Sequence, residues 1–389
     1  MLPTATVIAG IPTVNNTLYH RIRFIVGDPA ALIEFHPQDG APAGSILIVR
    51  DIEMERAKRQ ARADRVACPR DFTPTGGLSG DRETATAQAV AECLHRNHVK
   101  SVRSDRTLAL SFVEAIRAAG IRLVYDADLG VRDRRAKDAQ EIRWLQEAQH
   151  ATEAAIAMAC GMVARAKARR DGVLELDGAT LTSERVMSAI DVFLLERGYT
   201  TPGSIVAGGP VGADCHDHGH GSLRTEEPVI VDVFPRSRAT RYNGDCTRTV
   251  VHGRAPAELV RMHATVVAAK AAAIAAIRPG ATGDAVHRTT ARVVHDHGYH
   301  MGLPPQEAPD SWCGMVHGTG HGLGLDVHEP PLLAEDGPEL IVGDALTVEP
   351  GLYCRAIGGV RIEDLVIVTD HGCENLNRLP EGLEWGAPR

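Results

Sequence analysis

From about residue 137 onward, the sequence predicts the same order of elements twice: a helix, a second helix and a pair of strands. In the first pass the second helix is SERVMSAIDVFLLERG, which ends at Gly198. Glycine readily adopts the left-handed conformation that closes a helix. In the second pass the helix GDAVHRTTARVVHDHG ends in the same way at Gly298. Few residues match between the passes, so this pseudo-twofold repeat is one of element order, and it predicts a site between two matching strand pairs.

Residues 1–130 follow a different pattern, which predicts a separate α/β domain. Strand-like runs such as SILIVR and IRLVYDAD alternate with helical patterning in RETATAQAVAECLHRN. The charged stretch 130–143 separates the two regions, and such a run is usually solvated surface. We therefore expect an α/β domain over residues 1–134 and an α+β domain over residues 135–389.

The composition restricts the classes of partner. A net charge of −8 and a pI near 6.1 argue against nucleic acid or an anionic membrane as a partner. No run of about 18 apolar residues predicts a membrane helix, and the first residues lack the pattern of a secretory signal. The eight cysteines are scattered without a C-x-x-C pair, which indicates reduced thiols. A cytoplasmic protein that acts on a small or peptidic substrate is expected.

Four carboxylates lie in or beside strand-like runs of β-branched residues. Asp232 lies in VIVDVF, and Asp245 follows thirteen residues later on the returning strand, so the two can face one side of a hairpin. Neighbouring buried carboxylates repel each other unless a cation or a proton lies between them. The same reasoning applies to Glu349 in ALTVEPG and Glu363 in VRIEDLVIV. One such carboxylate would more often be a surface residue, but four in this arrangement favour a metal site.

The segment HGTGHGLGLDVHE (317–329) adds histidines to these acids. His317 and His321 have the spacing of a metal-binding pair on a helix, but the glycines between and after them disfavour a helix, so only one of the two need be a ligand. The glycines do not form the G-x-G-x-x-G pattern of a phosphate-binding loop. Carboxylates with an imidazole and no cysteine suit manganese, cobalt, iron or zinc.

In their order along the chain, these segments resemble the pita-bread metallopeptidases, the family of methionine aminopeptidase, aminopeptidase P and prolidase. The resemblance is specific over residues 137–380. Residues 1–130 are similar, more weakly, to the amino-terminal domain of creatinase and prolidase relatives. The resemblance implies an α/β amino-terminal domain and a pita-bread carboxy-terminal domain of the creatinase/aminopeptidase type.

The resemblance also implies a ligand set for two divalent metal ions, with manganese favoured and cobalt, zinc or iron as alternatives. It would consist of Asp232, Asp245, His321, Glu349 and Glu363. Asp232 would bind one ion, His321 and Glu349 the other, and Asp245 and Glu363 would bridge them. Two ions about 3.5–4 Å apart would lower the pKa of a water molecule between them.

Catalytic roles follow from the same resemblance. Glu349 is expected to carry a proton from the attacking water to the leaving amine. His328 is expected to contact the scissile carbonyl, and His317 and His216 the leaving-group side of the substrate.

Three further residues near these motifs have open assignments. His218 and His220 are expected to be solvated loop residues. Arg361 lies two residues before Glu363 on the same strand face, where it would orient the ligands or, about as readily, be a surface arginine of an edge strand.

The function implied is that of a dinuclear metallo-exopeptidase that hydrolyses Xaa-Pro bonds in short peptides, as a homodimer. The short predicted loop between Glu349 and Glu363 favours dipeptides slightly over longer peptides, and Arg361 or Arg355 could bind the product carboxylate. Alternatives are a metal-free amidinohydrolase of the creatinase type or another non-peptide hydrolase, a metal-dependent lyase of the same fold, and a non-catalytic peptide-binding protein.

Overall fold

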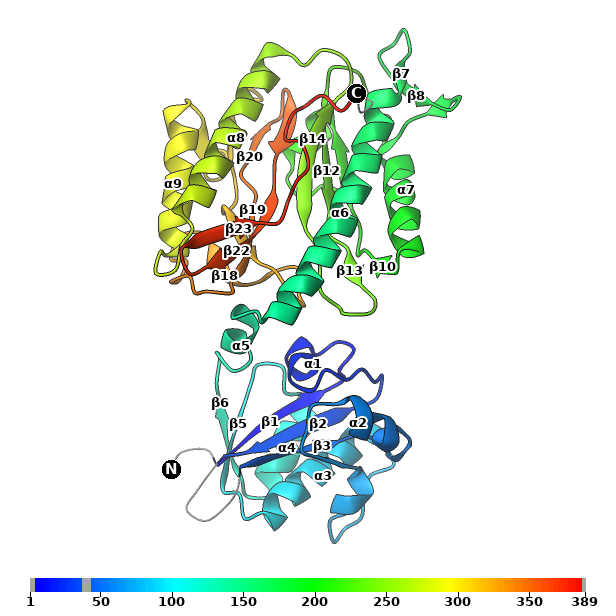
Figure 1. Cartoon of the computed structure of the whole chain (residues 1–389), viewed down its shortest axis with the longest axis vertical. Coiled ribbons are helices and arrows are strands. Elements are labelled where there is room, and N and C mark those ends of the chain that lie inside the picture. Colours follow the sequence, from blue (N-terminus) through cyan, green and yellow to red (C-terminus); the bar gives the residue numbers. More distant parts are fainter. Residues whose placement is uncertain (1–3, 37–42, 387–389) are drawn as a thin grey trace. The chain divides into compact units, whose positions relative to one another are not determined.

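The computed structural model describes residues 4–36 and 43–386. The chain divides into two compact units, Met1–Arg134 and Arg135–Arg389 (Figure 1). The short helix α5 (Val131–Arg135) spans the division. Each unit has its own sheets and its own buried core.

The amino-terminal unit contains a six-stranded sheet in the order β4-β3-β2-β1-β5-β6. Its strands are β1 (Ala5–Gly10), β2 (Ala30–Phe35), β3 (Gly44–Ile48), β4 (Arg65–Ala67), β5 (Ser101–Ser104) and β6 (Arg122–Tyr125). Its helices are α1 (Asn16–Ile22), α2 (Met54–Gln60), α3 (Arg82–Arg96) and α4 (Leu110–Ala118), with 3₁₀ turns η1 (Asp51–Glu53) and η2 (Pro69–Phe72).

Alternating side chains of this sheet build two cores, one on each face. Val7 and Ile33 pack with residues of α3 and α4, whereas their neighbours Ile8 and Leu32 pack with residues of α1 and α2. Successive side chains of a strand point to opposite faces, so a continuous apolar strand is buried on both sides. The strand runs and helices expected for an α/β domain are therefore present.

The carboxy-terminal unit contains the repeated order of helices and strands. Its helices are α6 (Ala139–Arg165), α7 (Ser183–Glu196), α8 (Ala257–Ala276) and α9 (Gly283–Asp296). Thr182 caps α7 and Thr282 caps α9, each accepting a backbone N–H through its hydroxyl. Both helices end before a glycine with positive φ, at Gly198 and Gly298. The expected helix ends are confirmed.

The strands of this unit form several small sheets (Figure 1). The first half has β11 (Ile205–Gly208), β12 (Pro228–Val233) and β14 (Cys246–Val251), with the 3₁₀ turn η3 (Gly209–Ala213). The second half has one sheet of β15 (His300–Met301), β16 (Cys313–Met315), β20 (Gly351–Cys354) and β21 (Gly358–Arg361). Its other sheet has β18 (Glu329–Leu333), β17 (Gly320–Gly322), β19 (Ala345–Val348), β22 (Asp364–Thr369) and β23 (Gly372–Asn375). Peripheral strands are β7 (Lys167–Ala168), β8 (Leu174–Leu176), β9 (Ala179–Thr180), β10 (Tyr199–Thr200) and β13 (Arg236–Ser237).

Two details differ from the expected strand pairs. Asp232 pairs with Thr247 across β12 and β14, so Asp245 lies just before the returning strand and not opposite Asp232. The segment between Glu349 and Glu363 is the hairpin of β20 and β21, where a short loop was expected. In both cases the acids lie at strand ends, where the backbone can still turn their side chains toward a common point.

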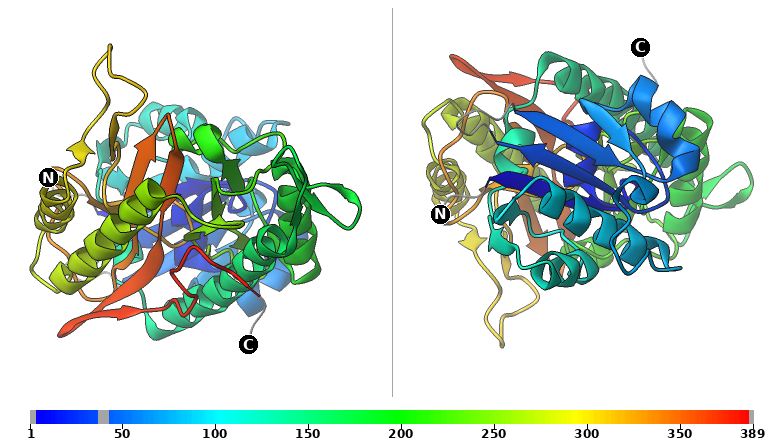
Figure 2. Two further views of the ribbon diagram at one scale, coloured as in Figure 1. Left: turned by 90° about the horizontal axis from the view of Figure 1, so that it is seen from above. Right: turned by 90° about the horizontal axis from the view of Figure 1, so that it is seen from below.

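Helix α8 is long and apolar enough to cross a membrane by length and composition alone, with a mean hydropathy of 1.4. In the fold, however, it lies across the strands of the second half (Figure 2, left). Its residues Met262 and Val266 join a core with Leu352 of β20. Lys270, in the middle of the helix, is buried and ion-paired with Asp364. These contacts are those of a core helix.

Candidate metal centre

All five predicted ligand side chains line one cavity of about 390 Å³ in the carboxy-terminal unit. They lie in or directly beside five different strands, namely β12, β14, β17, β19 and β22. Each half of the repeat contributes two carboxylates, and the glycine-rich segment of the second half contributes the imidazole. The cavity lies between strands of the two halves, where the pseudo-twofold repeat predicts a site.

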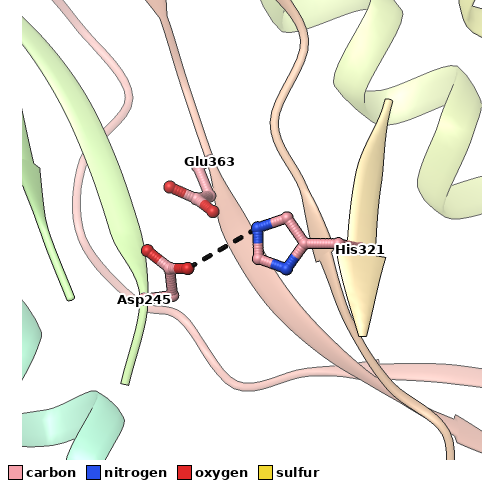
Figure 3. A group of neighbouring side chains, drawn as sticks. All are labelled: Asp245, His321 and Glu363. Atoms are coloured by element: carbon pink, nitrogen blue, oxygen red, sulfur yellow. Dashed lines mark ion pairs between the residues drawn. The ribbon is translucent and has the colours of Figure 1, made fainter. Parts of the chain in front are cut away.

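The closest group in this cavity is Asp245, His321 and Glu363 (Figure 3). One potential ligand atom from each of them lies within 4.8 Å of the other two. Nε2 of His321 lies 3.8 Å from Oδ2 of Asp245 and 3.4 Å from Oε1 of Glu349. The space between these atoms is of the size that a shared cation needs.

His321 is held in the form that binds a metal. Its Nδ1 lies 3.1 Å from the carbonyl oxygen of Gly322, so Nδ1 carries the proton and Nε2 directs a lone pair at the acids. Burial, followed by the neighbouring His328, lowers the pKa of His321 to about 3. The ring is therefore neutral at pH 7.

The acids of the cavity have raised pKa values because they are buried together. Burial, and next Glu363, raise the pKa of Asp245 well above its usual range, and burial followed by Glu349 does the same for Glu363. Burial raises the pKa of Glu349 to about 8, although Arg361 opposes this. A cluster of this kind is stable as carboxylates only when positive charge lies among them, so the residues fit divalent cations.

Only one of the two carboxylate oxygens of Asp232 has a hydrogen-bond partner among the described residues. Its Oδ2 accepts a hydrogen bond of 2.7 Å from Nη2 of Arg361. Its Oδ1 is buried and has no hydrogen-bond partner in the described part of the chain. A buried acceptor without a donor costs free energy, and a metal ion at this oxygen would remove that cost.

Arg361 is buried and does not lie on the surface. It is 3% exposed, although β21 is the outer strand of its sheet, and Thr249 of β14 accepts a hydrogen bond from its backbone N–H. The surface alternative for this residue is therefore wrong. Its guanidinium also donates to the hydroxyl of Tyr353 at 2.8 Å and to the carbonyl of Cys215 at 3.3 Å.

His317 lies at the end of the same chain of hydrogen bonds. Its Nδ1 lies 2.8 Å from the carbonyl oxygen of Gly318, which leaves Nε2 to accept from the Tyr353 hydroxyl at 2.8 Å. Burial, and next the charge of Arg361, lower the pKa of His317 to about 4. The neutral ring of His317 is thus linked through Tyr353 and Arg361 to Asp232.

The other predicted histidines lie at the more exposed side of the cavity. His328 and His216 both line it, and the ring of His328 meets that of His321 edge-on, with centroids 4.3 Å apart. His218, expected to be a solvated loop residue, is exposed but also lines the cavity, because its carbonyl accepts from the N–H of Val206 in β11. His220 is exposed, as expected.

Several residues that position the ligands were not identified from the sequence. Gln149 of α6 receives the N–H of Asp245 and donates to its carbonyl, at 2.9 and 2.7 Å. The hydroxyl of Thr247 donates to Glu363 at 2.7 Å, and that of Thr347 accepts the N–H of His321 at 3.0 Å. Thr247 and Thr347 lie two residues from a ligand along a strand, and this same-face spacing was the available signal.

Comparison with known proteins places the chain among peptidases. Residues 143–370 match metallopeptidase family M24. The chain belongs to this family. The family name implies that this M24 peptidase uses divalent metal ions.

Relatives of the M24 peptidase extend over both of its units. It is 29% identical to a probable dipeptidase PepE of Mycobacterium tuberculosis over 388 residues, which cover 97% of the chain and 93% of the relative. A prolidase structure from Pyrococcus horikoshii superposes with a TM-score of 0.76 at 21% identity, covering 98% of the chain and 95% of that protein. An X-Pro aminopeptidase from Thermotoga maritima gives a TM-score of 0.76 at 21% identity, covering 98% and 97%. The expected pita-bread fold is confirmed.

Proposed function

We propose that this M24 peptidase is a dinuclear exopeptidase that hydrolyses Xaa-Pro bonds in short peptides. The observation that carries the proposal is the complete set of five ligand side chains in one cavity, with an unpartnered buried oxygen on Asp232. The names of several relatives, Xaa-Pro dipeptidase and X-Pro aminopeptidase, supply the specificity. The full ligand set also argues against a metal-free amidinohydrolase and a non-catalytic binding protein.

In this proposal Asp232 would hold one ion, His321 and Glu349 would hold the other, and Asp245 and Glu363 would be shared between them. When bound, the ions supply a water of lowered pKa and stabilise negative charge that develops on the substrate carbonyl. Manganese is favoured for a site of oxygen and imidazole donors without sulfur, and cobalt, zinc or iron are the alternatives.

The remaining roles belong to side chains around the ligands. Glu349 lies beside His321 and carries the proton from the attacking water to the leaving amine. His328, exposed in the cavity, donates to the scissile carbonyl as charge develops on it. His317 and His216 contact the leaving-group side, with His317 held by Tyr353.

The different roles proposed for His321, as a metal ligand, and for His328, as a donor to the substrate, can be tested by substitution. We expect His321→Ala to lose bound metal, because its Nε2 points at the carboxylates. We expect His328→Ala to keep the metal and to lose about 10²–10³ in kcat, as for removal of a donor to a developing oxyanion. Metal content after dialysis and steady-state kinetics are measured for both. Equal loss of metal in the two variants would refute the division.

The proline specificity is tested with three substrates under saturating Mn²⁺. A bond before proline is a tertiary amide without an N–H, so a site for it need not offer a partner for that donor. We expect kcat/KM for Ala-Pro and Ala-Pro-Ala to exceed that for Ala-Ala-Ala by at least tenfold, about 1.4 kcal/mol. A preference for Ala-Ala-Ala would overturn the Xaa-Pro proposal while leaving the peptidase family unchanged.

We also propose that the enzyme is cytoplasmic. All eight cysteines are free, as in proteins of reducing compartments. The homodimer remains a prediction, for which light scattering in solution is the measurement.

A further inference from the structure

A second cavity, of about 590 Å³, adjoins the metal centre. Cys215 and His216 line both cavities, so the two share a wall beside the proposed leaving-group side. We propose that the second cavity binds the residues that follow the proline of a longer substrate, and that Arg355 binds the terminal carboxylate of that peptide. This inference rests on the proposed function and names its substrate class: Xaa-Pro peptides of three or four residues with a free carboxylate.

One wall of this cavity is the loop 302–312 between β15 and β16, which projects from its unit (Figure 2). The loop is held in place at its end. The ring of Trp312 stacks on His300 with centroids 5.5 Å apart and planes within 8°, and the N–H of Ala356 donates to the carbonyl of Asp310 at 3.0 Å. Trp312 and the prolines of the loop form an apolar surface, which suits the side chains and proline rings of a peptide.

The arginines that line the two cavities differ in whether they can bind the carboxylate of a peptide, and this difference favours a longer peptide. Arg361 provides the only arginine or lysine among the described residues that line the first cavity, and it is already paired with Asp232. Arg361 therefore has no free ion-pairing capacity for a carboxylate on the proline itself. Arg355, in contrast, lines the second cavity, is exposed, and forms no ion pair with the described residues.

Acidic side chains also line the second cavity, but they already accept hydrogen bonds from backbone N–H groups. Asp214 accepts the N–H of His216 at 3.0 Å, and Asp217 accepts that of Gly219 at 2.8 Å. Neither is bonded to Arg355. The guanidinium is thus the group in this cavity with unused capacity for an anion.

The separation of Tyr353 and Arg355 along the chain limits the length of the substrate. Tyr353 contacts His317 of the first cavity, and Arg355 lies two residues further along, in the turn that follows β20. Two residues of chain separate Tyr353 from Arg355 by at most about 7 Å, which is the length of two extended residues of a substrate. The carboxylate that meets Arg355 is therefore one or two residues beyond the proline. Tripeptides and tetrapeptides should accordingly be better substrates than dipeptides, which reverses the slight dipeptide preference inferred from the sequence.

The test compares Ala-Pro-Ala with its carboxy-terminal amide in wild type, Arg355→Gln and the control Arg292→Gln. Arg292 is an exposed arginine of α9 that lines neither cavity. We expect wild type and the control to prefer the free acid by about tenfold in kcat/KM, the usual effect of a charge-assisted hydrogen bond. In Arg355→Gln the ratio of acid to amide should fall to about one.

Two results would overturn the inference. The first is an unchanged acid-to-amide ratio in Arg355→Gln. The second is an equal loss of kcat/KM for Ala-Pro and Ala-Pro-Ala, which would place the dipeptide carboxylate at Arg355. Failure of the Xaa-Pro proposal gives a different pattern, since it appears as a preference for Ala-Ala-Ala in wild type. The acid-to-amide ratio can then still be measured on Ala-Ala-Ala.

Discussion

Replacing Glu363 with alanine is expected to remove bound metal and to lower kcat/KM by more than about a hundredfold. Glu363 is 2% exposed, and one of its oxygens lies within 4.8 Å of potential ligand atoms of both Asp245 and His321. Loss of a residue that only orients a ligand typically costs about 10–100-fold in metal affinity or activity, so loss of a ligand should cost more. Metal content after dialysis and kcat/KM for Ala-Pro-Ala are the measurements.

Glu374→Ala is a matched control, because Glu374 is an exposed glutamate on β23. It should keep wild-type metal content and activity. The metal-free Glu363→Gln variant separates loss of a ligand from misfolding. It should melt no lower than metal-free wild type, because it removes one of several buried carboxylates that repel each other. Two metal equivalents in Glu363→Ala would show that Glu363 is not a ligand.

Replacing Arg361 with methionine is expected to lower the free energy of unfolding of the metal-free protein by about 3–5 kcal/mol. The substitution leaves Asp232, which is 8% exposed, as a buried carboxylate without its ion pair. It also removes the donor to Tyr353. For a domain of about 250 residues, this corresponds to a decrease in Tm of roughly 6–20 °C.

Thermal unfolding of metal-free wild type, Arg361→Met and Arg361→Lys measures this effect. Lysine should restore part of the loss, because it keeps the charge without the planar guanidinium that reaches both Asp232 and Tyr353. Arg292→Met serves as the control for loss of an exposed arginine and should change Tm little. A decrease below about 1 kcal/mol for Arg361→Met would show that solvent compensates for the missing charge.

The sequence by itself predicted the proposed metal ligands, which one cavity brings together, and the repeated element order. A carboxylate such as Asp232 in a run of β-branched residues is unfavourable unless another group compensates its charge. This pattern can be recognised from a few neighbouring residues of the sequence. The helix ends at Gly198 and Gly298 are equally local, because a glycine supplies the left-handed conformation that ends a helix. Local patterns of this kind also identified the resemblance to the M24 family.

Only the tertiary structure decided which residues support the ligands and what surrounds them. The ion pair of Asp232 with Arg361 joins residues 129 positions apart, and the bonds of Gln149 to Asp245 join residues 96 positions apart. No local pattern distinguishes a buried arginine on an outer strand from an exposed one. Its burial depends on which other strand packs against it, here β14 through Thr249. For the same reason, the second cavity appears only once the loop 302–312 is folded against the turn that carries Arg355.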